Sequence, residues 1–258
     1  MKTTRTLILI CLSFITSHSF AQEMWNVQND LDSYYQRVQY WNSHYQLDSA
    51  AKADAQLRAR LLYLTSNNPE TMKLSFKYLK YYDGLKIYSS SDKSFRIYQW
   101  DDEIGPTGHN YITVYQYIVD NKVQSASLLP GCQSQIASNM KYKNLYTLKT
   151  KTRIYYLATY AKKFSQEEAY EGVEVFSRND HSINDSIQII KSTMADTAYC
   201  DYGYMLSEPK GVTTHSIYFD KKKKTIFFPV VNKEYVVSSS YTAYKFNGTF
   251  FKEVAFKK

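Results

Sequence analysis

The chain lacks the short motifs by which many enzymes and nucleic-acid-binding proteins are recognised. Its 258 residues contain no glycine-rich phosphate loop, no G-x-S-x-G or H-E-x-x-H motif, and no S-x-x-K followed by plausible partners. Zinc-binding, arginine-rich and RNA-binding motifs are also absent. These absences argue against hydrolysis by a locally encoded nucleophile and against a nucleic-acid partner, and no cofactor is indicated.

Long apolar runs are equally scarce. After residue 21 none reaches half of the roughly 20 residues that cross a bilayer, so we expect no transmembrane segment in the mature chain. The one marked run, residues 7–15, follows two basic residues and precedes Ser19-Phe20-Ala21. This order is typical of a secretory signal peptide and predicts cleavage before Gln22 and export to the periplasm or the extracellular space.

Cysteine is rare, with three residues in all. Cys11 follows Ile10 inside the apolar run instead of a small residue, which argues against a lipid anchor. The remaining pair, Cys132 and Cys200, predicts a disulfide in an oxidising compartment, with two buried thiols as the alternative. A nucleophilic role is disfavoured because the neighbouring Asp201 would raise the pKa of the Cys200 thiol.

Glycine and proline are also few, at 8 and 5, whereas tyrosine is abundant at 26, with 13 phenylalanines and 3 tryptophans. Tyrosine suits half-buried sheet surfaces, since its ring packs while its hydroxyl stays wet, so an antiparallel β protein is expected. The formal net charge of +8 falls to about +6 without the signal. A mildly basic exported chain would favour a glycan or an acidic envelope polymer as partner.

Helical spacing marks residues 22–83 as a helical segment. Apolar residues recur at this spacing over residues 29–47, and Leu57, Leu61 and Leu64 share one face of a second helix. Asn68-Pro69-Glu70 predicts the cap of a third helix, which Asp83-Gly84 would end.

After Gly84 the period changes to two, which marks residues 84–258 as an antiparallel β domain. Strand pairs are expected around Asp92-Lys93 and Asp120-Asn121, and Asn247-Gly248 is the strongest type I′ hairpin signal. We expect a large meander that forms a curled sheet or a barrel. A propeller is the second choice, because no unit of 20 to 50 residues repeats.

The stretch "QWDDEIGPTGHNYITVYQY", residues 99–117, gathers acids, His109 and aromatic residues. Turn-forming residues connect two strands here, so we expect mainly solvated acids and a buried Trp100. Calcium could use Asp101, Asp102 and Glu103, but the spacing of an EF-hand loop is absent. Zinc would need more than His109, since His44, His181 and His215 are distant in sequence, so no metal site is predicted. The candidate ligand-binding residues are Trp100, His109, Tyr98 and Tyr111.

Two further polar clusters have structural and functional interpretations. Glu167-Glu168 and Glu171 could serve a glycosidase, which needs two facing carboxylates, but they read as solvated residues of a polar connection. Residues 221–224 are four lysines that would form a hairpin tip and keep an edge soluble, or would contact acidic glycan or lipopolysaccharide.

Three tracts carry a family resemblance, namely "FRIYQWDDEIGPTGHNYITVYQY", "YYLATYAKKFSQEEAYEGVEVFS" and "HSIYFDKKKKTIFFPVV...YTAYKFNGTFFKE". Across roughly residues 74–253 the chain resembles a group of uncharacterised secreted proteins of Bacteroidetes bacteria. The resemblance implies export and a shared aromatic-rich β fold, and it implies no function. The expected function is a non-catalytic envelope or extracellular binding protein for glycans; the alternative is a secreted hydrolase whose carboxylates converge only in the fold.

Overall fold

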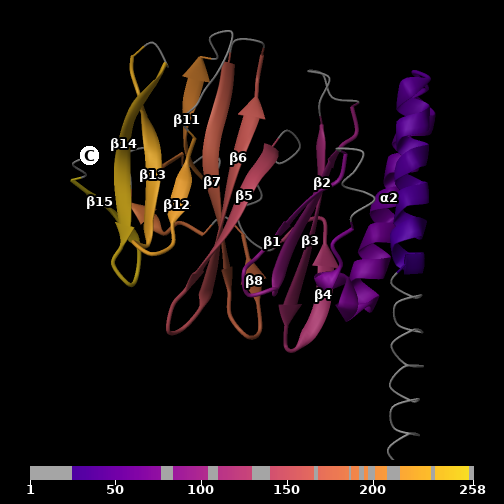
Figure 1. Cartoon of the computed structure of the whole chain (residues 1–258), viewed down its shortest axis with the longest axis horizontal. Coiled ribbons are helices and arrows are strands. Elements are labelled where there is room, and N and C mark those ends of the chain that lie inside the picture. The colour runs from indigo at the N-terminus through magenta and orange to yellow at the C-terminus, as the bar shows by residue number, and fades with distance from the viewer. Residues whose placement is uncertain are drawn as a thin grey trace, which may run out of the picture.

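The computed structural model describes residues 25–76, 84–103, 110–129, 140–165, 168–185, 187–191, 195–196, 201–207, 216–233 and 236–255. Within them two α-helices precede strands that pair almost entirely antiparallel in three sheets (Figure 1). The expected α+β class is confirmed. The signal segment 1–21 and both Cys132 and Cys200 lie outside the described residues, so the signal peptide and the disulfide stay predictions.

The two helices follow the predicted apolar spacing. The first is helical over residues 25–43, and the second, α2, spans Leu47–Asn67. Their buried faces include the predicted Leu57, Leu61 and Leu64. Tyr45 departs from its expected place in the first helix. Its φ of 56° ends helical geometry between the two helices, and its side chain is 88% exposed.

The expected third helix is only a short 3-10 helix, η1, over Pro69–Lys73. The predicted cap does form, since the Asn68 side chain accepts the Glu70 N–H at 3.1 Å. The chain then extends at Leu74, and Phe76 enters the core with a φ of 48°. The predicted end at Asp83 lies outside the described residues.

The first sheet is a four-stranded meander in the order β1-β2-β3-β4. Its strands are β1 Lys86–Ser89, β2 Phe95–Asp101, β3 Tyr111–Val119 and β4 Lys122–Ala126. Both predicted strand pairs are confirmed. Val119 pairs with Lys122 across a two-residue turn in which Asp120 and Asn121 have φ values of 50° and 56°, as a type I′ turn requires.

The central sheet has the order β10-β11-β7-β6-β5, with β8 paired to β7. Its strands are β5 Met140–Lys149, β6 Ile154–Lys163, β7 Glu168–Arg178, β8 Ile183–Asn184, β10 Ala195–Asp196 and β11 Asp201–Ser207.

The C-terminal sheet has the order β12-β13-β14-β15-β9. Its strands are β9 Ile190–Lys191, β12 Tyr218–Asp220, β13 Thr225–Val231, β14 Val237–Phe246 and β15 Phe251–Val254, and β9 adds in parallel to β15. Residues 221–224 form the predicted exposed hairpin tip. The predicted type I′ turn at Asn247-Gly248 is wrong. Phe246 pairs with Phe251 across four residues, and the Asn247 side chain accepts the N–H groups of Thr249 and Phe250 at 2.9 and 3.0 Å.

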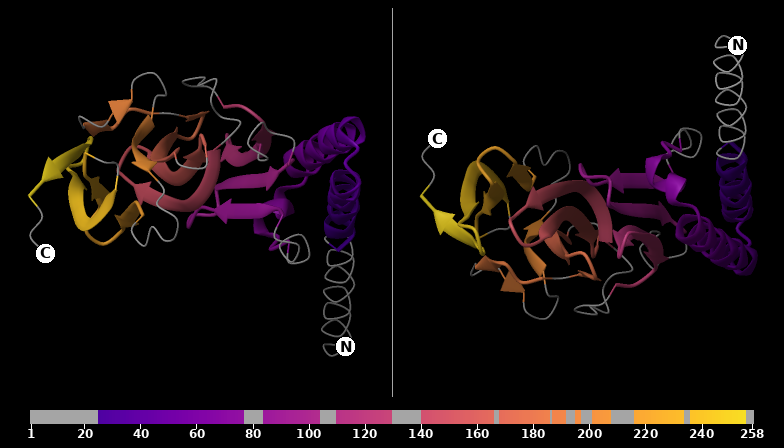
Figure 2. Two further views of the ribbon diagram at one scale, coloured as in Figure 1. Left: turned by 90° about the horizontal axis from the view of Figure 1, so that it is seen from above. Right: turned by 90° about the horizontal axis from the view of Figure 1, so that it is seen from below.

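The sheets and helices stack as successive layers along the long axis (Figures 1 and 2). One core fills the space between the C-terminal and central sheets, a second lies between the central and first sheets, and a third lies between the first sheet and the helices. The expectation of one large meander, as a curled sheet or a barrel with a propeller as the second choice, is corrected: the described strands form three separate sheets, and they close into neither a barrel nor a propeller.

The layering follows from strands that are apolar on both faces. β7 is buried at nine consecutive positions, and along it Val173 and Val175 face the C-terminal sheet while Tyr170 and Phe176 face the first sheet. A single curled sheet with one wet face would expose one of these sets, so the strand needs a covering layer on each side.

Side chains of the first sheet satisfy the free edge of β5. The Gln99 amide donates to the Met140 carbonyl at 2.7 Å and accepts the Tyr142 N–H at 2.8 Å. The Tyr88 hydroxyl donates to the Tyr142 carbonyl. Backbone groups that a neighbouring strand would otherwise pair are therefore used to join two layers.

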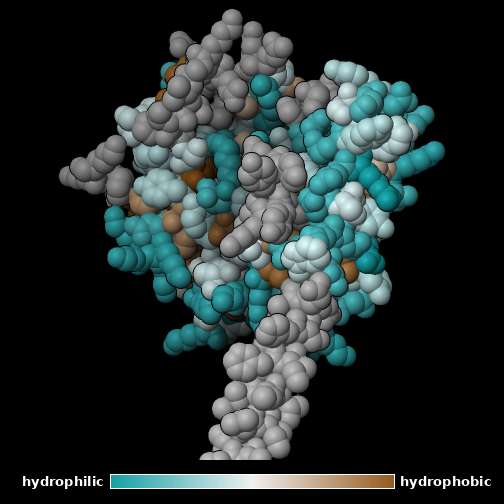
Figure 3. All heavy atoms as spheres, turned by 45° about the vertical axis from the view of Figure 1, so that its right-hand side comes forward, coloured by the Kyte–Doolittle hydropathy of each residue, from teal (hydrophilic) through white to brown (hydrophobic). Residues whose placement is uncertain are grey.

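Among the described residues on the face shown in Figure 3, hydrophilic residues predominate and brown residues are scattered in small patches. Among the described residues, no helix combines the length and the apolar character needed to span a membrane.

We expect Gln99→Leu to lower the free energy of unfolding by about 1–3 kcal/mol, because it leaves buried backbone groups of β5 without partners. Gln124→Leu, at an exposed position of β4, is the matched control and should change it by less than about 0.5 kcal/mol. Urea denaturation of both variants measures the difference. Equal effects would show that the amide bridge is unimportant.

Candidate functional site

Trp100 and Tyr98, two of the predicted ligand-binding residues, belong to the core. Trp100 is 1% exposed, as its predicted burial required, and its indole N–H donates to the Asp54 carboxylate of α2 at 2.5 Å. Burial raises the pKa of Asp54. Tyr98 is fully buried, and burial raises the pKa of its hydroxyl to about 12, so it stays protonated and donates to Gln116 at 2.7 Å.

The acids after Trp100 organise the loop through hydrogen bonds. The Asp101 carboxylate accepts the N–H groups of Glu103 and Asn110 at 2.9 and 3.0 Å. The expectation that Asp102 is solvated is wrong: it is 6% exposed, its carboxylate accepts the Asn110 amide, and its carbonyl accepts the Asn42 amide of the first helix at 3.0 Å. Asp102 therefore helps to fix the helices to the sheet.

Tyr111 is half-buried at the start of β3, where the Lys141 ammonium lies 5.7 Å from its ring centroid. Tyr111 and Trp100 line a hollow of about 320 Å³ that also includes Lys86 and Lys141. His109, the fourth candidate, lies outside the described residues.

The described histidines are engaged by nearby polar groups. His44 Nδ1 lies 2.7 Å from the Tyr40 carbonyl, and His181 Nδ1 lies 2.6 Å from the Asp120 carboxylate, which raises the pKa of that histidine. His215 lies outside the described residues. Within the described chain, no three His, Cys, Asp or Glu side chains are grouped so that they could hold a metal ion.

Glu171 is not the solvated residue that its sequence context suggested. It is 2% exposed, and its carboxylate accepts the hydroxyl of Tyr204 at 2.6 Å and pairs with Lys143. Glu174, also buried on β7, accepts the Tyr142 hydroxyl on the opposite face of the central sheet. Glu168 is exposed, and Glu167 lies outside the described residues. These two buried carboxylates do not face each other across a cleft.

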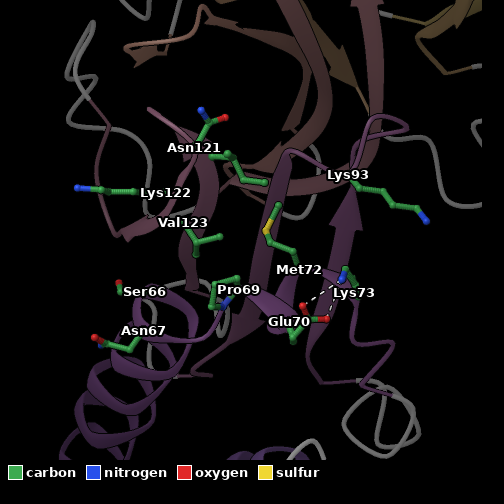
Figure 4. Close-up of a pocket in the computed structure, with 11 residues that line it drawn as sticks. Ser66, Asn67, Pro69, Glu70, Met72, Lys73, Lys93, Asn121, Lys122 and Val123 are labelled. Carbon is green, nitrogen blue, oxygen red and sulfur yellow. Dashed lines mark hydrogen bonds and ion pairs between the residues drawn. The ribbon is translucent and has the colours of Figure 1, made fainter. Parts of the chain in front are cut away.

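A hollow lies where the end of α2 and η1 meet the β3–β4 hairpin (Figure 4). This groove has a volume of about 540 Å³, within the range of roughly 300–1,000 Å³ that ligand sites occupy. It is lined by Ser66, Asn67, Pro69, Glu70, Met72, Lys73, Lys93, Ile118, Asn121, Lys122 and Val123.

Apolar groups form the floor of the groove, and charged groups stand at its rim. Met72 and Val123 point into the space between η1 and β4 in Figure 4, whereas Lys93 and Lys122 project on opposite sides. Lys73 pairs with Glu70 at 2.8 Å. Three ammonium groups thus surround the groove with one carboxylate.

A buried hydrogen-bond network fixes the η1 wall of the groove. The Arg96 guanidinium donates to the Thr71 carbonyl at 2.7 Å. The Gln116 amide donates to the Thr71 hydroxyl at 2.6 Å and to the Thr65 carbonyl at 2.9 Å. Through Tyr98, which bonds to Gln116, the network ties the end of α2 and η1 to the first sheet. The groove is therefore preformed.

Sequence reasoning missed the residues of this groove, because they come from three separate segments, residues 66–73, Lys93 and residues 118–123, and share no motif. One signal was present. Arg96 and Gln116 are polar positions inside aromatic strand runs, and buried polar residues in such runs usually have a specific partner.

The chain matches no protein-family model, no curated protein sequence and no solved structure at a significant level.

The structural role of Asp102 in the loop after β2 can be tested by comparison with its exposed neighbour Glu103. We expect Asp102→Ala to reduce the free energy of unfolding by about 1–3 kcal/mol, since the half-buried Asn110 amide loses its carboxylate acceptor. Glu103→Ala, the exposed control, should stay within about 0.5 kcal/mol of the parent. Thermal melts analysed together with urea titrations provide the comparison. A calcium-dependent rise in Tm that Asp102→Ala abolishes would instead favour a metal site.

Proposed function

We propose that the chain is an exported, non-catalytic binding protein that holds an acidic glycan in the groove between η1 and the β3–β4 hairpin. The observation that carries the proposal is a preformed groove with an apolar floor and three rim lysines against one glutamate. The apolar floor suits the C–H faces of sugar rings, and the Asn67 and Asn121 amides suit their hydroxyls. The lysines suit carboxylate substituents.

Binding without catalysis is supported by the lining of the groove. Glycoside hydrolysis uses two carboxylates on either side of the scissile bond. Glu70 is the one acid among the described residues that line the groove, and it is paired with Lys73. The buried Glu171 and Glu174 on opposite faces of β7 give the alternative, a secreted hydrolase, no support.

Export rests on the pattern of residues 1–21 and on the resemblance to secreted proteins of Bacteroidetes bacteria. An exported binding protein with a basic rim would meet acidic envelope or extracellular polymers as its natural ligands.

The test is calorimetric titration with hexagalacturonate and with the neutral hexasaccharide of galactose. We expect the acidic probe to bind more tightly, and to weaken as salt is raised from 50 to 500 mM by roughly tenfold or more, because exposed charges are screened. The double variant Lys93→Glu with Lys122→Glu should weaken binding at least tenfold.

The matched control is Lys221→Glu with Lys222→Glu, which makes the same change in charge at the exposed tip between β12 and β13. It should retain parental affinity. If both double variants lose binding equally, net charge and not the groove is responsible, and the proposed site is wrong. Chromatography of the probe after incubation separates binding from catalysis, because shortened products would favour the hydrolase.

A further inference from the structure

Tyr218, at the start of β12, presents an aromatic face to solvent. Its ring stacks on Phe227 of the neighbouring β13, with centroids 4.7 Å apart and planes 12° apart. Phe227 is 2% exposed, whereas Tyr218 is 39% exposed. Since Phe227 occupies one face of the Tyr218 ring, the exposed area belongs to the other face and to the ring edge.

The Tyr218 ring is held in this orientation from the side. Tyr241 of β14 meets it edge to face at 5.3 Å and 78°, and meets Phe227 in the same manner at 6.3 Å. A ring braced on one face and one edge loses little freedom when a ligand covers its remaining face.

Hydrogen-bonding groups lie close to this platform. Ser216, two residues before Tyr218 and so at most about 7 Å away along the chain, donates to the Glu171 carboxylate at 3.3 Å. Lys143 pairs with the same carboxylate and is partly exposed. Tyr241 lies near both parts: it touches Tyr218, and its pKa is raised first by burial, then by Tyr218 and then by the Glu171 charge.

We propose that Tyr218 is the platform of a second binding site, which takes a neutral pyranose ring. The negative face of an aromatic ring attracts the slightly positive C–H groups on one side of a pyranose. The hydroxyls at the rim of the sugar then reach Ser216 and Lys143, which Glu171 positions. A flat apolar ligand would use the platform but not these polar groups, so the combination favours a sugar.

This site lies on the C-terminal sheet and does not depend on the groove at η1. The probes are cellohexaose and xylohexaose, titrated by calorimetry. Tyr218→Ala should weaken binding at least tenfold, while Tyr218→Phe keeps the stacking face and should bind within about threefold of the parent. Tyr63→Ala removes a tyrosine of α2 that is 59% exposed and is the matched control, with no loss expected.

Tyr218→Leu guards against misfolding, because it still covers Phe227 but lacks an aromatic face; it should bind as weakly as Tyr218→Ala. The groove variant Lys93→Glu with Lys122→Glu should bind both neutral probes like the parent, so the two proposals can fail separately. The inference is overturned if the parent binds neither probe, or if Tyr218→Leu binds as tightly as Tyr63→Ala.

Discussion

Burial of β6 and β7 on both faces is the constraint on which the rest of the molecule depends. Once these strands are apolar on each side, the chain must supply one layer before them and another after them. The first sheet and the C-terminal sheet are those layers, and the helices in turn cover the outer face of the first sheet. The first sheet is a meander of consecutive strands, whereas β9 leaves the order of the chain and pairs with β15 in the C-terminal sheet.

Double-sided burial leaves little space for polar groups, yet β7 carries Glu171 and Glu174 in its interior. Each carboxylate accepts a tyrosine hydroxyl, from Tyr204 on one face and from Tyr142 on the other. Burial raises the pKa of both hydroxyls, which keeps them protonated as donors. Part of the abundance of tyrosine is thus explained by its ability to fill a core with a ring and still supply a hydrogen bond.

The sequence predicts local structure better than it predicts the assembly. Period-two alternation and turn residues located the hairpins around Asp92 and Asp120, because these signals act within a few residues. The separation into three sheets depends on which faces meet, and Tyr98 and Phe95 look alike in sequence although they face different cores.

The same contrast between local and long-range interactions explains which candidate site residues were predicted correctly. Trp100 was correctly expected to be buried, since a large ring at a strand end usually packs. Asp102 and Glu171 were misjudged because their partners, Asn42 and Tyr204, are distant in sequence. The residues that line the groove share no sequence motif. Met72 and Val123 line the same groove only because the fold places η1 beside β4.

The hydrogen bonds from Gln99 and Tyr88 to the free edge of β5 also affect self-association. An edge strand with unpaired backbone groups can pair with a strand of a second molecule, which can lead to fibres. Here the Gln99 side-chain amide already forms the hydrogen bonds that such a strand would make with the backbone of Met140 and Tyr142. The bulge beyond Tyr142 and the inward ion pair of Lys143 interrupt the regular ladder that an intruding strand would need. Contacts that join two layers thus also keep the β5 edge of the central sheet from acting as a template for other copies.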